Sequence, residues 1–81
     1  MAATREDVDR WINMAKKDKN KFIISVCDTW DYEDYPVFCK DLDELYSSYP
    51  EYSGKNMQRV NEIIRINEDG SVDENLRMSA L

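Results

Sequence analysis

The chain has 81 residues and a net charge of −6, with 42% hydrophobic and 35% charged residues. This length allows one domain with one modest core, and the hydrophobic content argues against wholesale disorder. The acidic balance disfavours direct binding to nucleic acid, because such binding requires a basic surface.

The sequence also bears on the compartment and on cysteine chemistry. No apolar run approaches membrane-spanning length, and the N-terminus lacks the apolar stretch of a signal peptide, so we expect a cytoplasmic protein without membrane contact. There, Cys27 and Cys39 are expected to be reduced and buried. Their spacing and the absence of histidine exclude the familiar zinc arrangements. A disulfide would need oxidising conditions and a hairpin register that places the two cysteines opposite each other.

The first predicted element is an amphipathic helix capped by Thr4. Acidic residues follow in its first turn and lysines gather at its end, as the helix dipole favours. Its apolar residues recur at helical spacing and form one stripe: Val8, Trp11, Ile12 and Ala15. Because Trp11 belongs to this stripe, we interpret it as a core residue rather than a binding anchor.

A β-hairpin follows the helix. Residues 22–27 are apolar on both faces and rich in β-branched side chains, which is typical of a strand covered on two sides. Residues 35–39 form a second predicted strand. It contains Pro36, which cannot donate to a ladder, so we expect this strand to lie at an edge of the sheet or to begin near the proline.

The loop between these strands, residues 28–34, is acidic and aromatic. It holds four acids and no basic residue, and it is followed by Tyr35. One interpretation is a solvated loop whose aromatic side chains fold back onto the core. The other is a binding surface, because Trp and Tyr supply large rigid contact area and acids select a basic partner.

A second helix is predicted to begin at Asp41 and to end at Pro50, with Leu42, Leu45, Tyr46 and Tyr49 as its apolar stripe.

Residues 56–67 fit a helical stripe or one face of a strand. The β-branched cluster and the turn residues after it favour a strand, with Val60, Ile64 and Ile66 on one face. Residues 71–81 are expected to form a loosely ordered tail. Packing of Val72, Leu76 and Met78 on the core is left open.

These elements predict one compact α+β domain over residues 1–70. The order is α-β-β-α-β, and a three-stranded, mostly antiparallel sheet with both helices packed on it would bury each apolar stripe.

No catalytic or cofactor motif stands out. Oxygen ligands for Mg²⁺ or Ca²⁺ are available from the loop acids, but their spacing does not match a calcium-binding EF-hand loop. Cys27 precedes a run of acids, which disfavours a thiolate nucleophile. Both glycines lie in predicted turns rather than in a phosphate-binding loop. We therefore expect a non-enzymatic protein without a metal or cofactor.

Two stretches, IISVCDTWDYEDYPV (residues 23–37) and NMQRVNE (residues 56–62), resemble segments of small acidic accessory proteins of tailed bacteriophages and prophages. The resemblance extends over most of the predicted domain. It implies a product that binds host machinery in the cytoplasm of an infected bacterium, such as a counter-defence inhibitor of a CRISPR effector. It assigns no activity and no functional residue.

The sequence thus predicts an inhibitor of a host protein with a basic surface, a class that includes nucleic-acid-binding proteins. The alternative is sequestration of a nucleotide-like ligand between aromatic rings. A monomer and a homodimer are both compatible with the sequence. The predicted partner-binding residues are those of the hairpin loop and its flanks: Asp28, Trp30, Asp31, Tyr32, Glu33, Asp34 and Tyr35.

Overall fold

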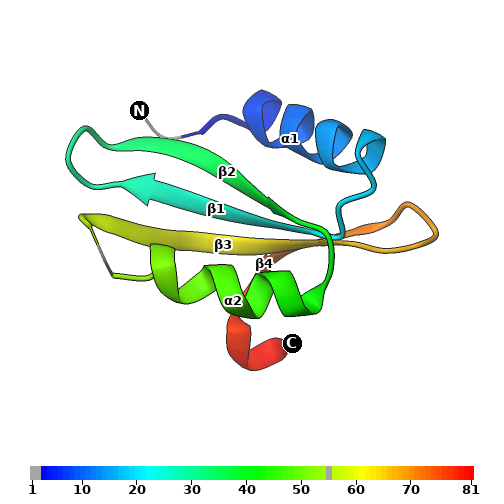
Figure 1. Cartoon of the computed structure of the whole chain (residues 1–81). Helices are drawn as coiled ribbons and strands as arrows, with labels where there is room; N and C mark the ends of the chain where they lie inside the picture. Colours follow the sequence, from blue (N-terminus) through cyan, green and yellow to red (C-terminus); the bar gives the residue numbers. More distant parts are fainter. Residues whose placement is uncertain (1–2, 55) are drawn as a thin grey trace.

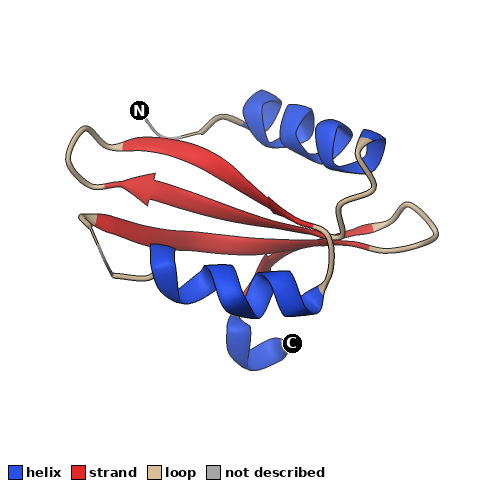
Figure 2. Cartoon of the chain, viewed as in Figure 1, coloured by secondary structure: helices blue, strands red, loops and turns tan. Residues whose placement is uncertain are grey.

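A computed structural model describes residues 3–54 and 56–81 of the chain. Two helices lie on opposite sides of a four-stranded antiparallel sheet (Figures 1 and 2), so the α+β class is confirmed. The strands follow the spatial order β2-β1-β3-β4, with β1 and β3 in the centre. The elements, in chain order, are α1 (Arg5–Lys17), β1 (Phe22–Asp28), β2 (Glu33–Cys39), α2 (Leu42–Tyr52), β3 (Gln58–Ile66), β4 (Val72–Leu76) and the 3-10 turn η1 (Met78–Ala80).

Strand β1 supplies both faces of the sheet with core residues. Ile23 packs with Ile64 of β3 beneath α1, whereas Ile24 packs with Ile63 of β3 in the cluster beneath α2. All four side chains are buried because both faces of the central strands are covered. This arrangement confirms the prediction of a strand that is apolar on two sides.

Helix α1 begins and packs as its sequence predicts. The Thr4 hydroxyl accepts a hydrogen bond from the Asp7 amide, and the Asp7 carboxylate accepts one from the Thr4 amide. Trp11, Ile12 and Ala15 are buried against the sheet. Trp11 is therefore a core residue, as expected.

Helix α2 departs from the prediction in two respects. It is capped by Asp41 as expected, but it continues to Tyr52, so the predicted end at Pro50 is wrong. The extra turn brings the Tyr52 ring against Tyr35 of β2, and this packing favours helix over the local proline effect. The predicted stripe is also only partly buried, because Leu42 and Tyr46 remain exposed.

Strand β3 confirms the strand interpretation of residues 58–66 but changes its facing pattern. Ser25 pairs with Glu62, whereas the next residue, Val26, pairs with Val60, which leaves Asn61 as an extra residue in a β-bulge. The bulge reverses the alternation of side chains. Val60 therefore packs in the cluster beneath α2, not on the face of Ile64 and Ile66, and that part of the prediction was wrong.

The predicted three strands were too few, because residues 72–76 form β4 against β3. This strand lies in the segment that was expected to be a loose tail. Val72 packs in the cluster beneath α1, while Leu76 and Met78 pack in the cluster beneath α2. The expectation of a loose tail is therefore wrong for residues 72–76, and the segment contributes to both layers of the core.

The hairpin register separates the two cysteines. Cys27 pairs with Asp34 near the turn, whereas Cys39 pairs with Phe22 at the other end of the hairpin. Both thiols are free and buried. The conditional expectation that they lie opposite each other is therefore wrong, and a disulfide between them would require a different register. Pro36 lies within β2, which is an edge strand as predicted.

Candidate interaction surface at the hairpin tip

The turn between β1 and β2 is built by local hydrogen bonds of its acidic residues. The Asp28 carboxylate accepts a hydrogen bond from the Trp30 amide at 2.9 Å, and the Asp28 carbonyl accepts one from the Tyr32 amide at 2.7 Å. Tyr32 has φ of +59°, which is unusual for a residue with a bulky side chain. These bonds hold the turn in a shape that leaves the side chains of Trp30 and Tyr32 exposed.

A second segment, just before β3, is attached to this turn. The Thr29 amide and hydroxyl both donate to the carbonyl oxygen of Met57, at 2.7 and 2.5 Å. Asn56 and Met57 both have positive φ values, 53° and 61°. The bonds bring the Met57 backbone beside the hairpin turn, at the end of the sheet shown on the left of Figure 1.

The two segments together present large exposed side chains. Trp30 is 76% exposed, Tyr32 66% and Met57 54%. Two acids of the turn, Asp31 and Glu33, are exposed beside them. We call these five residues the tip surface: Trp30, Asp31, Tyr32, Glu33 and Met57. Single exposed apolar residues are common on proteins, but several grouped with charges are typical of an interaction site.

The remaining predicted site residues support the tip rather than form its surface. Asp34 is partly buried and its carboxylate accepts a hydrogen bond from the Ala3 amide at 2.8 Å. Tyr35 packs edge-to-face on Tyr52 with ring centroids 6.4 Å apart, and its hydroxyl is bonded to the Gln58 side chain. Burial raises the pKa of the Tyr35 phenol, and neighbouring Tyr52 and Asp28 add to the rise, so this group stays neutral.

The structure therefore divides the seven predicted residues into two groups. Trp30, Asp31, Tyr32 and Glu33 lie together on the exposed tip, and Asp28, Asp34 and Tyr35 are tied into its base. Met57 was missed by sequence reasoning. It lies 27 positions from Trp30 in the sequence, and it reaches the tip through the pairing of Gln58 with Asp28 and the hydrogen bonds of Thr29.

The acids of the tip keep their charges available to a partner. Among the described residues, none of the ion pairs involves an acid between positions 28 and 34. Like charges in a short turn repel each other, and an approaching basic group would relieve that repulsion. The tip can therefore attract a cationic surface.

The aromatic rings near the tip do not enclose a ligand in the described part of the chain. Trp30 and Tyr32 are largely exposed, whereas Tyr35 is held beneath α2 by Tyr52. No three Cys, Asp or Glu side chains within residues 3–54 and 56–81 are grouped as metal ligands are. The geometry of the tip is that of a projecting surface, which suits contact with another macromolecule better than capture of a small one.

Comparison with known proteins gives no relative: no family model matches the chain, and no curated protein or solved structure is significantly similar to it. Within the described residues, no helix has the length and apolar character needed to cross a membrane.

Proposed function

We propose that this chain is a non-enzymatic binding protein that inhibits a host protein by docking its tip surface on a basic patch of that protein. The observation that carries the proposal is the exposure of Trp30, Tyr32 and Met57 at one end of the sheet, with Asp31 and Glu33 exposed in the same turn. Large aromatic side chains dominate binding energy at protein interfaces when a partner covers them.

The exposure of Trp30 is not explained by a role in the core. The core clusters beneath α1 and α2 contain neither Trp30 nor Tyr32. Exposing aromatic surface to water is unfavourable in the free protein, and burying that surface against a partner lowers the free energy of the complex. The adjacent acids would speed association with a positively charged surface and exclude acidic ones.

The class of partner follows from the charge and from the phage resemblance. A basic surface is typical of proteins that bind nucleic acid, which makes a bacterial nucleic-acid-binding defence protein, such as a CRISPR effector, a fitting target. Under this proposal the chain acts inside an infected bacterium. Partner binding there would block access of the target to its own nucleic acid.

Affinity capture from a bacterial lysate, read by mass spectrometry, tests the proposal. The tip variant combines Trp30→Ser with Asp31→Lys. Its matched control combines Tyr46→Ser with Asp43→Lys on the exposed side of α2, so it removes one aromatic ring and reverses one charge elsewhere. Asp34 is avoided because its carboxylate accepts a hydrogen bond from the distant Ala3 amide at 2.8 Å, whereas that of Asp31 accepts a longer one, 3.3 Å, from the Glu33 amide within the turn.

The proposal predicts a host protein that wild type and the control retain and the tip variant loses. Circular dichroism should show that both variants are folded. Retention of the same proteins by all three chains, or no specific protein on wild type, would contradict the proposed function.

A further inference from the structure

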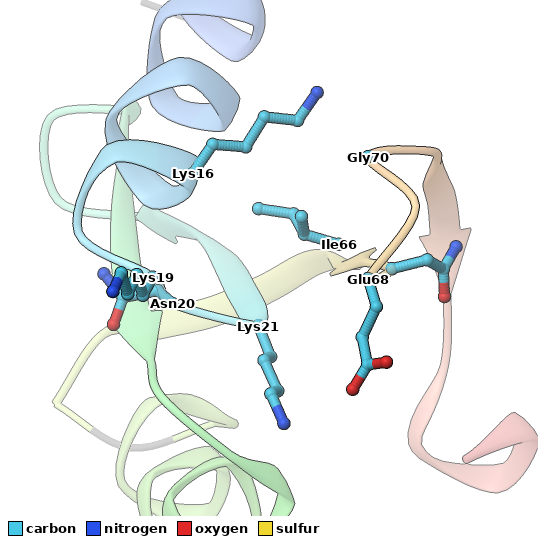
Figure 3. Close-up of a pocket in the computed structure, with 8 residues that line it drawn as sticks. Lys16, Lys19, Asn20, Lys21, Ile66, Glu68 and Gly70 are labelled. Carbon is cyan, nitrogen blue, oxygen red and sulfur yellow. The ribbon is translucent and has the colours of Figure 1, made fainter.

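A hollow of about 460 Å³ lies at the end of the sheet opposite the tip surface. It is formed between the C-terminal end of α1 and the turn that joins β3 to β4 (Figure 3). Ile66 contributes apolar surface, and Lys16, Lys19, Lys21, Asn20 and Asn67 are among the other lining residues. Figure 3 shows the Lys16 and Lys21 side chains extending to opposite sides of the hollow. This volume is within the range of pockets that hold small ligands.

The hollow is positively charged although the whole chain is acidic. Its three lysines stand against a single lining acid, Glu68. The ion pairs among the described residues are formed by arginines, and none involves a lysine. The ammonium groups around the hollow are therefore not neutralised by neighbouring carboxylates in the described structure.

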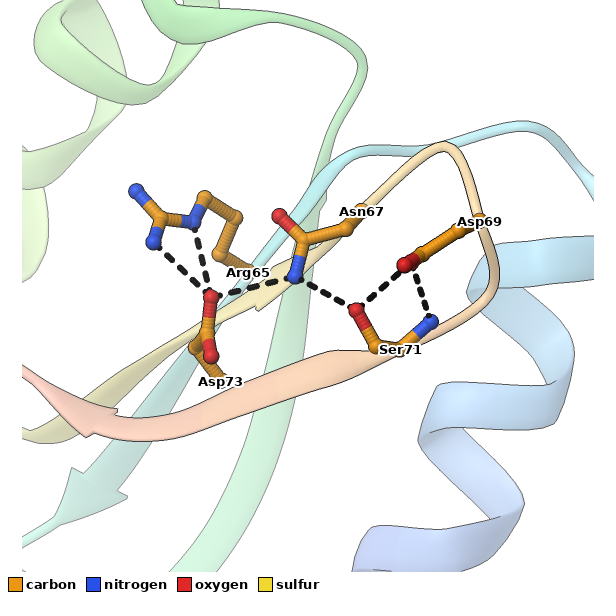
Figure 4. A network of polar contacts seen from close by, with 5 residues as sticks. All are labelled: Arg65, Asn67, Asp69, Ser71 and Asp73. Atoms are coloured by element: carbon orange, nitrogen blue, oxygen red, sulfur yellow. Dashed lines mark hydrogen bonds and ion pairs between the residues drawn. The ribbon is translucent and has the colours of Figure 1, made fainter.

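Other acids of the β3–β4 turn are engaged within the turn itself (Figure 4). The Asp73 carboxylate accepts hydrogen bonds from Arg65 at 2.8 Å and from Asn67 at 3.1 Å. The Asp69 carboxylate accepts bonds from the amide and hydroxyl of Ser71. This network holds one wall of the hollow and engages one oxygen of each carboxylate, Oδ2 of Asp73 and Oδ1 of Asp69.

The opposite wall is fixed by backbone hydrogen bonds. The Asn20 amide bonds to the Ala15 carbonyl at 2.8 Å, and the Lys21 amide and carbonyl are bonded to Cys39 and Ile66. Lys19 holds φ of +59°, a conformation that glycine adopts more readily at the end of a helix. A lysine in this strained position is consistent with a use for its side chain.

We propose that this hollow is a binding site for a small phosphorylated ligand. Lysine ammonium groups bind phosphate oxygens as mobile point charges, so the lysines at the rim can close on an anion that enters between them. The Asn20 and Asn67 amides are further donors, and Ile66 with the lysine stems offers apolar surface to the rest of the ligand. The proposal is independent of the tip surface, which lies at the other end of the sheet.

Titration of the full chain, followed by ¹H–¹⁵N correlation spectra, tests this site. The probes are inorganic pyrophosphate, for the shared phosphate chemistry, and ATP and AMP, which show whether a nucleoside adds affinity. We expect saturable shifts confined to the amides of residues 16–21 and 66–70.

Charge variants connect those shifts to the lysines. Replacing Lys16, Lys19 and Lys21 by Gln should weaken pyrophosphate binding at least tenfold, which corresponds to about 1.4 kcal/mol. A control variant carries Lys17→Gln and Lys40→Gln, two lysines that do not line the hollow, and should change the affinity far less than the Lys16→Gln/Lys21→Gln pair, which removes the same charge. Glu68→Gln should strengthen binding, and Trp30→Ser should leave it unchanged.

The results that would overturn the proposal are equally specific. They are the absence of saturable binding, shifts spread over all lysines of the chain, or an equal loss of affinity in the hollow and control variants. Dispersed spectra of every variant establish that it is folded, so a loss of binding cannot be ascribed to unfolding.

Discussion

Thr29 donates two hydrogen bonds to one carbonyl oxygen of Met57, from its amide at 2.7 Å and from its hydroxyl at 2.5 Å. These bonds join segments that are distant in sequence and place Met57 beside the hairpin turn. The tip surface therefore depends on Thr29 although this residue is not part of it.

Thr29→Val should loosen the tip while preserving the volume of the side chain. The amide bond remains and the hydroxyl bond is lost, so we expect the free energy of unfolding to fall by about 1 kcal/mol. Partner binding should weaken because the Met57 carbonyl is then held by one hydrogen bond from Thr29 instead of two. Urea unfolding measures the first effect and affinity capture the second. Thr29→Ser retains the hydroxyl and should resemble wild type; equal losses in both variants would contradict this role of the hydrogen bond.

The C-terminal segment is expected to be part of the folding unit. Ending the chain after residue 70 removes β4 and uncovers apolar surface of β3 on both faces. We expect the free energy of unfolding to fall by more than about 3 kcal/mol, measured by urea denaturation. Removing residues 77–81 alone retains β4 and should cost less. Full stability of the shorter chain would show that β4 adds nothing.

Cys39 is predicted to be inert in the folded protein. Its side chain is fully buried, and burial, together with nearby Glu44, raises the pKa of its thiol to about 11. Because the thiolate is the reactive form, a disulfide reagent at about pH 8 should modify Cys39 only when the chain opens. The Cys27→Ala variant isolates this thiol, and the reaction should accelerate with added urea. Native-state reaction at the rate of glutathione would contradict this expectation.

The β3–β4 turn should contribute to acid sensitivity. Hydrogen bonds from Asn67 and Arg65 lower the pKa of Asp73 below its usual range. A carboxylate with a lowered folded-state pKa stabilises the protein above its unfolded-state pKa of about 4, and this stabilisation is lost as the pH falls through the folded-state pKa.

Asp73→Asn should therefore reduce the loss of stability on acidification below about pH 4, as measured by urea unfolding at several pH values. It should also lower stability at neutral pH, because the ion pair with Arg65 is removed. Glu51→Gln, at an exposed carboxylate outside the turn, controls for the loss of one negative charge. A profile for Asp73→Asn that parallels wild type at every pH would contradict the assignment.

Local sequence patterns predicted most of the secondary structure because each core element carries its own signal. The cap at Thr4, the stripe of α1 and the two-faced apolar run of β1 are local features that the fold preserves. The departures have non-local causes. The length of α2 depends on Tyr52 meeting Tyr35, and the facing of Val60 depends on a bulge that forms only when β3 pairs with β1.

The candidate site was only partly predictable for a similar reason. Composition identified the turn, and Trp30 and Tyr32 are exposed there as a binding surface requires. Composition did not show that Asp34 and Tyr35, unlike Trp30 and Tyr32, lie in the base of the tip. Asp34 is held there by its bond to the Ala3 amide and Tyr35 by its packing on Tyr52. Strand β4 was missed because residues 72–76 have little periodicity, and their pairing depends on the exposed edge of β3.

The affinity of the captured partner for single-site variants tests the tip surface most directly. Trp30→Ala should weaken binding by more than about 2 kcal/mol, or roughly thirtyfold, because a central aromatic anchor is lost. Tyr46→Ala removes an exposed aromatic ring from α2 and should change the dissociation constant by less than about threefold. Equal effects of the two substitutions, or no effect of Trp30→Ala, would contradict the docking of this tip on its partner.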